Sequence, residues 1–221
     1  MLPTNRRQLG RDGSVTALAP PWAPAVAVAV LALGGFLTAM VWHATQLNPF
    51  DAWVLHWQEL AYHRGHRVAA IISGTVLPVA VLTAVAGAAQ AWLVDRWDAL
   101  VLALVAVPST LCVKSVLKQL VHRQWPGGPK LLYPSGHLAL ATAAALVAVL
   151  VARVVRTSSP VRRLVPWLGG GYVLLITIAR LVEEVHSLTD LLGGAATGLL
   201  VTLGAALGIT AWSGRGSHGH P

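Results

Sequence analysis

The stretch "LLYPSGHLALATAAALVAVLVARVV", residues 131–155, decides the fold class of this chain. From Gly136 onward it is almost wholly apolar, and its length suits the about 20 residues that a helix needs to cross a bilayer. It opens, however, on the polar tetrapeptide Pro134-Ser135-Gly136-His137. The stretch therefore predicts a membrane-spanning helix with an unusually polar start that needs an explanation.

The composition extends this interpretation to the whole chain. Of the 221 residues, 55% are hydrophobic and only 11% are charged, and the mean hydropathy is +0.64. Soluble domains carry about a quarter charged residues, so an ordinary soluble domain is excluded. The predicted spans lie at residues 22–46, 68–93, 98–117, 136–155, 163–182 and 188–212. The prediction is an all-α, polytopic membrane protein with six transmembrane helices in one bundle.

These spans form one membrane domain over residues 21–212 and leave no room for a separate soluble domain. Residues 1–20 are polar and then proline-rich, and residues 213–221 consist mostly of glycine, serine and histidine. We expect a flexible cytoplasmic N-terminus and a flexible C-terminal tail on either side of the membrane domain.

The tryptophans and basic residues predict how the chain lies in the membrane. Indole rings anchor at the membrane–water boundary, and tryptophans fall near the predicted span ends at positions 22, 42, 92, 97, 167 and 212. Six spans place both termini on one side, together with nine of the 16 lysines and arginines. The positive-inside rule then puts the termini in the cytoplasm of a cell-membrane protein. The net charge of +8 is explained by this topology, and no basic stripe indicates nucleic-acid binding.

Two further segments carry predictions about packing. Apolar residues recur at helical spacing within residues 47–67, which favours a short interfacial helix in the first outward loop, as an anchor rather than a substrate gate. The last span contains Gly194-x-x-x-Gly198 and Gly204-x-x-x-Gly208, a spacing that lets helices approach closely. We assign this approach to packing within one chain rather than to a dimer, and the oligomeric state is left open.

All three lysines of the chain lie in "KSVLKQLVHRQWPGGPK", residues 114–130. Lys114 and Lys118 are four residues apart and so share one helix face, and Arg123 follows them. Taken alone, this segment has two interpretations. The charges extend to the interface from a helix end, or they bind an anionic group at the membrane surface.

The tetrapeptide at 134–137 has a chemistry of its own. Ser135 suits an N-cap, and a helix N-terminus binds phosphate through its free N–H groups and partial positive charge. Gly136 lets another group approach the backbone closely, and His137 can transfer protons near neutral pH. Taken alone, a capped helix with a boundary histidine is the commoner explanation.

The third polar segment is "ARLVEEVHSLTD", residues 179–190, which contains Arg180 between two predicted spans. His186 and Asp190 are four residues apart, so a carboxylate can hold one ring nitrogen and activate the other, as in a catalytic dyad. Ser187 and Asp190 also have the spacing of a capping box for the sixth span. The intervening acids are expected to be solvated: Glu183 and Glu184.

The predicted topology brings these three segments to one membrane face, where polar groups are functional candidates. Together they resemble the signature of the type 2 phosphatidic-acid phosphatase superfamily, which is Lys-x6-Arg-Pro, Pro-Ser-Gly-His and Ser-Arg-x5-His-x3-Asp. The second motif is complete at residues 134–137. The third matches with Ala179 in place of serine, and the motif residues are Arg180, His186 and Asp190.

The first motif is matched by Lys118, followed after six residues by Trp125-Pro126 in place of arginine-proline. Tryptophan cannot donate the forked pair of hydrogen bonds with which arginine holds a phosphate. We hypothesise that Arg123, two residues earlier, supplies the missing charge.

The resemblance implies a mechanism through a phosphohistidine. His186 would be the nucleophile, Asp190 would orient it, and His137 would protonate the leaving oxygen and then activate water. No metal ion or other cofactor is implied, because lysine, arginine and helix N–H groups neutralise the phosphate. The phosphoryl oxygens would be held by Lys118, Arg123, Ser135, Gly136 and Arg180.

The implied substrate is a lipid phosphate or pyrophosphate that stays in the bilayer while its head group meets the extracytoplasmic face. Polyprenyl pyrophosphate, phosphatidylglycerol phosphate and phosphatidate all fit. The alanine- and arginine-rich composition with few lysines is typical of a GC-rich bacterial genome, and in a bacterium a cell-envelope lipid carrier is the expected substrate. The alternatives are a lipid phosphotransferase and a catalytically lapsed family member that binds or transports anionic lipid. An unrelated channel or transporter is less favoured, because it leaves the clustered motifs unexplained.

Overall fold

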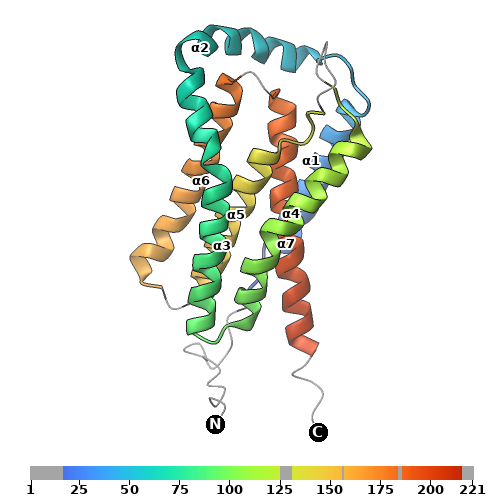
Figure 1. The fold of residues 1–221 in the computed structure, drawn as a ribbon. Coiled ribbons are helices and arrows are strands. Elements are labelled where there is room, and N and C mark those ends of the chain that lie inside the picture. Colours follow the sequence, from blue (N-terminus) through green and yellow to red (C-terminus); the bar gives the residue numbers. More distant parts are fainter. Residues whose placement is uncertain (1–16, 125–130, 156, 184–185, 216–221) are drawn as a thin grey trace, which may run out of the picture.

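The computed structural model describes residues 17–124, 131–155, 157–183 and 186–215, and for residues 57–64, 214 and 215 it describes the backbone only. Seven helices run lengthwise or across one bundle, as Figure 1 shows. They are α1 (Ala23–Val41), α2 (Pro49–Gly74), α3 (Val76–Leu93), α4 (Trp97–Val121), α5 (Gly136–Val154), α6 (Ser159–Val182) and α7 (Leu188–Arg215). Within these ranges there is no strand, only an isolated antiparallel bridge between Gln124 and Leu131.

Six segments of these helices are long and apolar enough to cross a membrane. They are Ala23–Val41, Gly65–Leu93, Trp97–Val121, Gly136–Val154, Ser159–Val182 and Leu188–Ser213. Each overlaps one predicted span, so the predicted six-span, all-α architecture is confirmed. The third span extends four residues beyond the predicted end at 117 and thereby places Lys118 in the last turn of α4.

The first outward loop differs from the prediction in its connection to the second span. Instead of a separate short helix, the interfacial segment is the first part of α2, which lies across one end of the bundle and then turns down beside it (Figure 1). Asn48 caps α2 by accepting a hydrogen bond from the backbone N–H of Asp51 at 2.8 Å. The helix is interrupted at Thr75, because Pro78 has no N–H for the carbonyl of Gly74.

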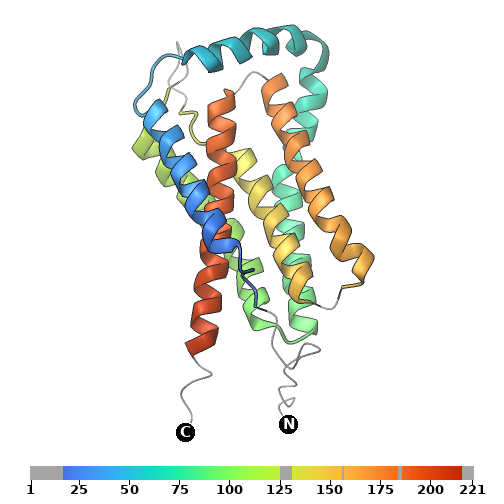
Figure 2. The same ribbon diagram turned by 180° about the vertical axis from the view of Figure 1, so that it is seen from behind.

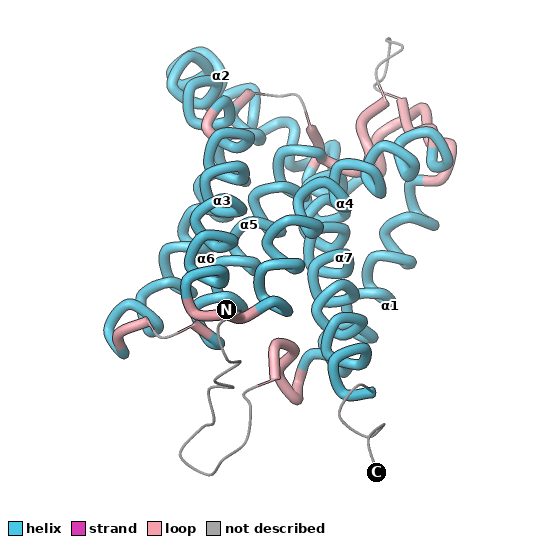
Figure 3. The backbone as a smooth tube through the Cα atoms, turned by 60° about the horizontal axis from the view of Figure 1, so that its bottom comes forward, coloured by secondary structure: helices cyan, strands magenta, loops and turns pink. Residues whose placement is uncertain are grey.

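The α5 helix is the centre of the bundle. It packs against α3, α4, α6 and α7, and 67% of its spanning window is buried, a larger share than in any other candidate span. Figure 3 shows α5 between α3 and α6 on one side and α4 and α7 on the other. Its buried face is rich in alanine, and such small side chains let membrane helices approach closely. The polar tetrapeptide therefore begins the most enclosed helix of the protein.

The ends of the bundle agree with a membrane setting. The six tryptophans predicted to lie at span ends are all exposed at the protein surface, as are large apolar side chains along the helices. Figure 2, in which the bundle is seen from behind, shows α1 in the foreground beside α7. The backbone N–H of Ala19 donates to Thr210 Oγ1 at 3.1 Å, so the chain before α1 lies beside the C-terminal part of α7. The predicted flexible segment at residues 1–20 lies mostly outside the described residues.

Candidate active site

The three motif segments meet at the end of the bundle that α2 crosses (Figure 1). The backbone N–H of Ser135 donates to the carbonyl oxygen of Asp190 at 2.9 Å, which joins the start of α5 directly to the start of α7. Residues 134–137 and 186–190 are therefore held side by side by their main chains. The site does not depend on flexible side chains for this contact.

Glycines on α7 allow this close approach. A Cβ atom on Gly194 would lie 2.4 Å from the carbonyl oxygen of Ser135, and one on Gly198 would lie 2.3 Å from that of Ala139. Both values are far below contact distance, so these two positions require glycine. The predicted close packing within one chain is confirmed here. Gly204 and Gly208 behave differently, since an added Cβ at either position would meet no atom within 4 Å.

Ser135 and Gly136 begin the first turn of α5. Ser135 occupies the N-cap position, but its side chain makes no cap hydrogen bond, and its buried Oγ has no hydrogen-bond partner among the described residues. A Cβ on Gly136 would lie 3.3 Å from Lys114 Nζ. Glycine at 136 thus makes room for a lysine ammonium group against the N-terminus of α5.

Lys114 is therefore a candidate site residue, although it was not among the residues that the family resemblance implied as phosphate ligands. The signal was present in its four-residue spacing from Lys118, which puts both lysines on one face of α4. Lys118 Nζ donates to the carbonyl oxygen of Leu131 at 3.0 Å, which holds it near residues 134–137. His137 lies close enough to both lysines for their charges to act on its ring.

His186 and Asp190 face each other as their spacing predicts. Nδ1 of His186 lies 3.7 Å from Oδ2 of Asp190, and both side chains are buried. Burial lowers the pKa of His186 below the usual value, the hydrogen-bonding and charge of Asp190 oppose this, and the charges of Arg180 and Lys118 add to the lowering. The imidazole is thus neutral at pH 7, the form that can act as a nucleophile.

Arg180 comes from the last turn of α6 and forms an ion pair with Glu183. The prediction that Glu183 is solvated is wrong, because its side chain is only 9% exposed and is paired with Arg180. The Nε atom of Arg180 is buried and has no hydrogen-bond partner in the described part of the chain. The charge of Arg180 acts on both His137 and His186, which places it with the two histidines.

Arg123 lies elsewhere than expected. It is 1% exposed, and its Nη1 atom donates to Asp190 Oδ1 at 2.7 Å while its Nη2 atom donates to Asp51 Oδ2 at 2.8 Å. With both terminal nitrogens held by carboxylates, the guanidinium does not offer a free fork to a phosphate. The hypothesis that Arg123 replaces the motif arginine as a phosphate ligand is therefore not supported by its position.

The capping-box interpretation of the third motif is also realised. Ser187 N–H and Oγ both donate to Asp190 Oδ2, at 3.1 and 2.9 Å. Asp190 thus serves the start of α7 and faces His186 at the same time.

Three positions named in the sequence analysis lie outside the described residues: Trp125, Pro126 and Glu184. Among the described residues, no group of three histidine, cysteine or carboxylate side chains is arranged to hold a metal ion.

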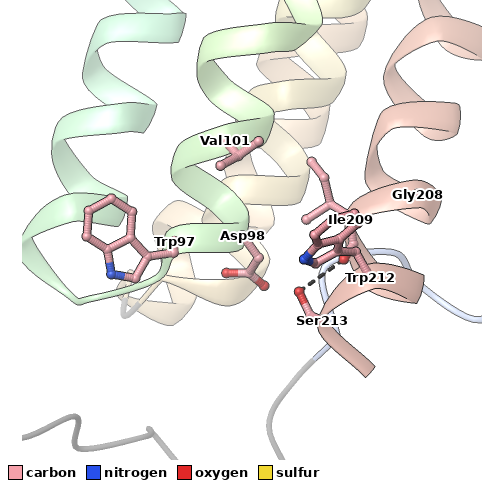
Figure 4. Close-up of a pocket in the computed structure, with 7 residues that line it drawn as sticks. All are labelled: Trp97, Asp98, Val101, Gly208, Ile209, Trp212 and Ser213. Carbon is pink, nitrogen blue, oxygen red and sulfur yellow. Dashed lines mark hydrogen bonds between the residues drawn. The ribbon is translucent and has the colours of Figure 1, made fainter. Parts of the chain in front are cut away.

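The described residues line cavities at both ends of the bundle. One, of about 390 Å³, lies between α1, α4 and α7 and is lined in part by Tyr133, whose hydroxyl is 2.9 Å from that of Thr38. The other, of about 440 Å³, lies at the opposite end of α4 and α7, where Trp97, Asp98 and Trp212 line it (Figure 4). The first cavity adjoins the site, because Tyr133 precedes Pro134 in the chain.

Comparisons with known proteins identify relatives of this arrangement. A protein-family model described as the PAP2 superfamily matches residues 99–213. Among solved structures, the fold is similar to that of a transmembrane PAP2-type phosphatidylglycerolphosphate phosphatase from Bacillus subtilis. The TM-score is 0.67 with 20% sequence identity, and the match covers 88% of this chain and 98% of that chain. No curated protein matches the chain.

Proposed function

The chain belongs to the PAP2 superfamily, and we propose that it is an integral-membrane lipid phosphatase that works through a phosphohistidine. Its substrate would be a phosphomonoester or pyrophosphate on a lipid. The observation that carries the proposal is the Ser135–Asp190 backbone hydrogen bond, because it joins the segment with one candidate catalytic histidine to the segment with the other.

His186 is the proposed nucleophile. Since Asp190 faces Nδ1, the other ring nitrogen, Nε2, attacks phosphorus in line with the leaving oxygen. The N–P bond forms as the P–O bond to the lipid, or to the lipid monophosphate, breaks. Asp190 fixes the orientation of the ring and stabilises the positive charge that the imidazole gains.

His137 is the proposed acid and base. It gives a proton to the leaving oxygen in the first step and takes one from water in the second, so that hydroxide attacks the phosphohistidine and inorganic phosphate leaves. The products are a lipid alcohol from a monoester, or a lipid monophosphate from a pyrophosphate. His186 returns to its neutral form.

The phosphoryl oxygens would be held by positive groups and by the first turn of α5. Lys118 and Arg180 supply charge, and the N–H groups at the start of α5 from Gly136 onward supply hydrogen bonds. The N–H of Ser135 is already used by Asp190, so Ser135 would contribute its buried hydroxyl instead. We add Lys114 to this set, because its ammonium group lies against Gly136.

A lipid substrate fits the place of the site. The site lies at one end of six membrane-spanning segments and beside the cavity bordered by Tyr133. The basic residues favour an orientation with the termini in the cytoplasm and the site on the extracytoplasmic face. Phosphatidylglycerol phosphate, polyprenyl pyrophosphate and phosphatidate are the substrates to compare, and the relative from Bacillus subtilis acts on the first of these.

The test is phosphate release from these three lipids by purified protein in the presence of EDTA. We expect release by the wild type and by His56→Ala, an exposed histidine on α2, and none by His186→Ala. A labelled phosphoenzyme that is stable in base and labile in acid would identify the phosphohistidine. No release from any lipid by wild type would replace the proposal with a lipid-binding role, and phosphate transfer to an added alcohol would identify a phosphotransferase.

A further inference from the structure

A buried ion cluster adjoins the proposed dyad on the side away from His186. It consists of Asp51, Arg123 and Asp190, whose exposed fractions are 1%, 1% and 0%. Arg123 bridges the two carboxylates with separate nitrogens, at 2.7 Å to Asp190 and 2.8 Å to Asp51. Only a planar, forked cation can serve two carboxylates in this way, so a lysine is not equivalent.

Asp51 brings the first turn of α2 into this cluster. Its Oδ1 accepts the backbone N–H of Thr189 at 3.0 Å, and its Oδ2 accepts the Thr189 hydroxyl at 2.6 Å. Asn48 Nδ2 donates to the same Oδ2 at 2.8 Å. One carboxylate on the interfacial segment therefore holds the residue next to Asp190 in the chain.

The cluster determines which oxygen of Asp190 faces the histidine. Oδ1 is taken by Arg123, and Oδ2 receives Ser187 and faces Nδ1 of His186. A carboxylate held at one oxygen by a buried guanidinium cannot rotate freely. Its second oxygen is then kept at the imidazole.

Stability alone does not account for such a cluster. Burying charges costs several kcal/mol of hydration for each ion, and apolar side chains in the same volume often serve a fold as well or better. The start of α7 already has a local cap, because the backbone N–H of Asp190 donates to Ser187 Oγ at 3.5 Å. What the charged cluster adds is a fixed direction for Asp190.

We propose that Asp51 and Arg123 are positioning residues, which hold Asp190 against His186 and so make the first turn of α2 a part of the active site. This inference rests on the proposed function for the role of His186. Neither residue contacts the substrate in this arrangement, and both act through Asp190.

The test uses Asp51→Asn and Arg123→Lys, which preserve size or charge and disturb folding least. The matched controls are Asp98→Asn and Arg96→Lys. These two residues form a second, mostly buried ion pair at the other end of α4. We expect kcat per folded molecule to fall about 10- to 100-fold in the two site variants, as on loss of other outer partners of active-site ligands. KM should stay close to that of wild type, because neither side chain touches the substrate.

The pH profile separates positioning from a purely structural role. His186 is faced by Asp190 from α7, Arg180 from α6, Lys118 from α4 and His137 from α5. Asp190 raises the pKa of His186, so a loosened carboxylate lets that pKa fall further. We expect the acid limb of kcat/KM to move to lower pH in both site variants and to stay in place in both controls.

A readout without substrate keeps this test separate from that of the proposed function. The ring nitrogens of His186 can be observed by NMR in protein with 15N-labelled histidine, with the signals assigned from His186→Gln. We expect one tautomer, protonated at Nδ1, in wild type and a mixture in Asp51→Asn and Arg123→Lys. Wild-type tautomer, kcat and pH profile in these variants would overturn the inference, as would a rise in KM alone. Absence of phosphate release by wild type would overturn only the proposed function.

Discussion

The two ends of α4 carry the same kinds of residue in different arrangements. At its start, Arg96 and Asp98 are two residues apart, and their side chains pair at 2.6 Å with exposed fractions of 9% and 19%. Just beyond its end, Arg123 is fully buried and meets carboxylates from α2 and α7. The first pair is local in sequence, whereas the hydrogen bonds of the second join positions up to 72 residues apart.

The difference shows what turns an ion pair into part of a site. Asp98 also accepts the N–H of Ala99, and Arg96 donates to the carbonyl of Val154, so the pair at the start of α4 secures helix ends. The cluster at Arg123 forms only when three helices have come together. One of its carboxylates, that of Asp190, faces a histidine, whereas the carboxylate that pairs with Arg96 does not.

The largest expected effect on kcat comes from replacing the aspartate of the ion pair at one end of α4 and comparing it with the same replacement at the other end. Asp190→Asn keeps the shape of the side chain but offers the histidine an amide, and we expect kcat to fall by about 10⁴-fold, as on loss of the carboxylate of a catalytic triad. Asp98→Asn should leave kcat unchanged. Phosphate release under single-turnover conditions measures both, and equal losses would remove the distinction between the two ends.

The next effect concerns stability and compares two glycine pairs on α7. Gly194→Ala places a Cβ against the backbone of Ser135, and we expect a loss of about 1–3 kcal/mol in the free energy of unfolding from overpacking. Gly204→Ala meets no neighbour and should stabilise the helix by up to about 1 kcal/mol. Denaturant unfolding in detergent micelles measures both. A stable Gly194→Ala protein would contradict the close contact between α5 and α7.

A smaller effect, on KM, tests whether Lys114 on α4 is a phosphate ligand. Lys114→Met removes one charged hydrogen-bond donor, and a loss of about 1.4 kcal/mol in binding corresponds to a tenfold rise in KM. Arg162→Met, an exposed charge on α6, is the control. An unchanged KM for Lys114→Met, measured with the best lipid of the panel, would leave Lys118 and Arg180 as the phosphate-binding cations.

The smallest effect is a displacement along the pH axis. Burial lowers the pKa of His186, and the neutral ring is the reactive form, so activity should persist below the usual histidine pKa of about 6.5 and fall only at lower pH. Asp190 opposes that lowering, so the residual activity of Asp190→Asn should persist to still lower pH. The profile of kcat/KM between neutral and acidic pH checks both directions. An acid limb above the usual value would contradict a neutral, buried His186.

The spans and the meeting of the motif segments at one end of the bundle were predictable, because they follow from local patterns and from the order of the spans. Apolar runs of spanning length identify membrane helices one at a time, and the order of the spans then puts three motifs at one end. The spacing of Gly194 and Gly198 predicted a close contact, and the backbone distances agree. Each of these features can be predicted from a short segment of the sequence.

The ion cluster was not predictable in this way. Asp51 belongs to the polar face of an amphipathic segment, where a solvated acid is the ordinary expectation, and its partner Thr189 lies 138 residues away. Arg123 was predicted as a phosphate ligand, but a sequence does not show which anion a positive charge meets. The guanidinium nitrogens that were predicted to bind phosphate are instead paired with two carboxylates of the protein.

The place of Asp51 has a consequence for exchanging parts between related proteins. The family model covers residues 99–213 and so includes Arg123 and Asp190, but not the α2 carboxylate that completes their cluster. A chimaera that takes its first two helices from a member without an acid at this position would keep the motif residues of α5 and α7 and still remove one of the two carboxylates that pair with Arg123. Positions 51 and 123 should therefore be transplanted together, as one unit.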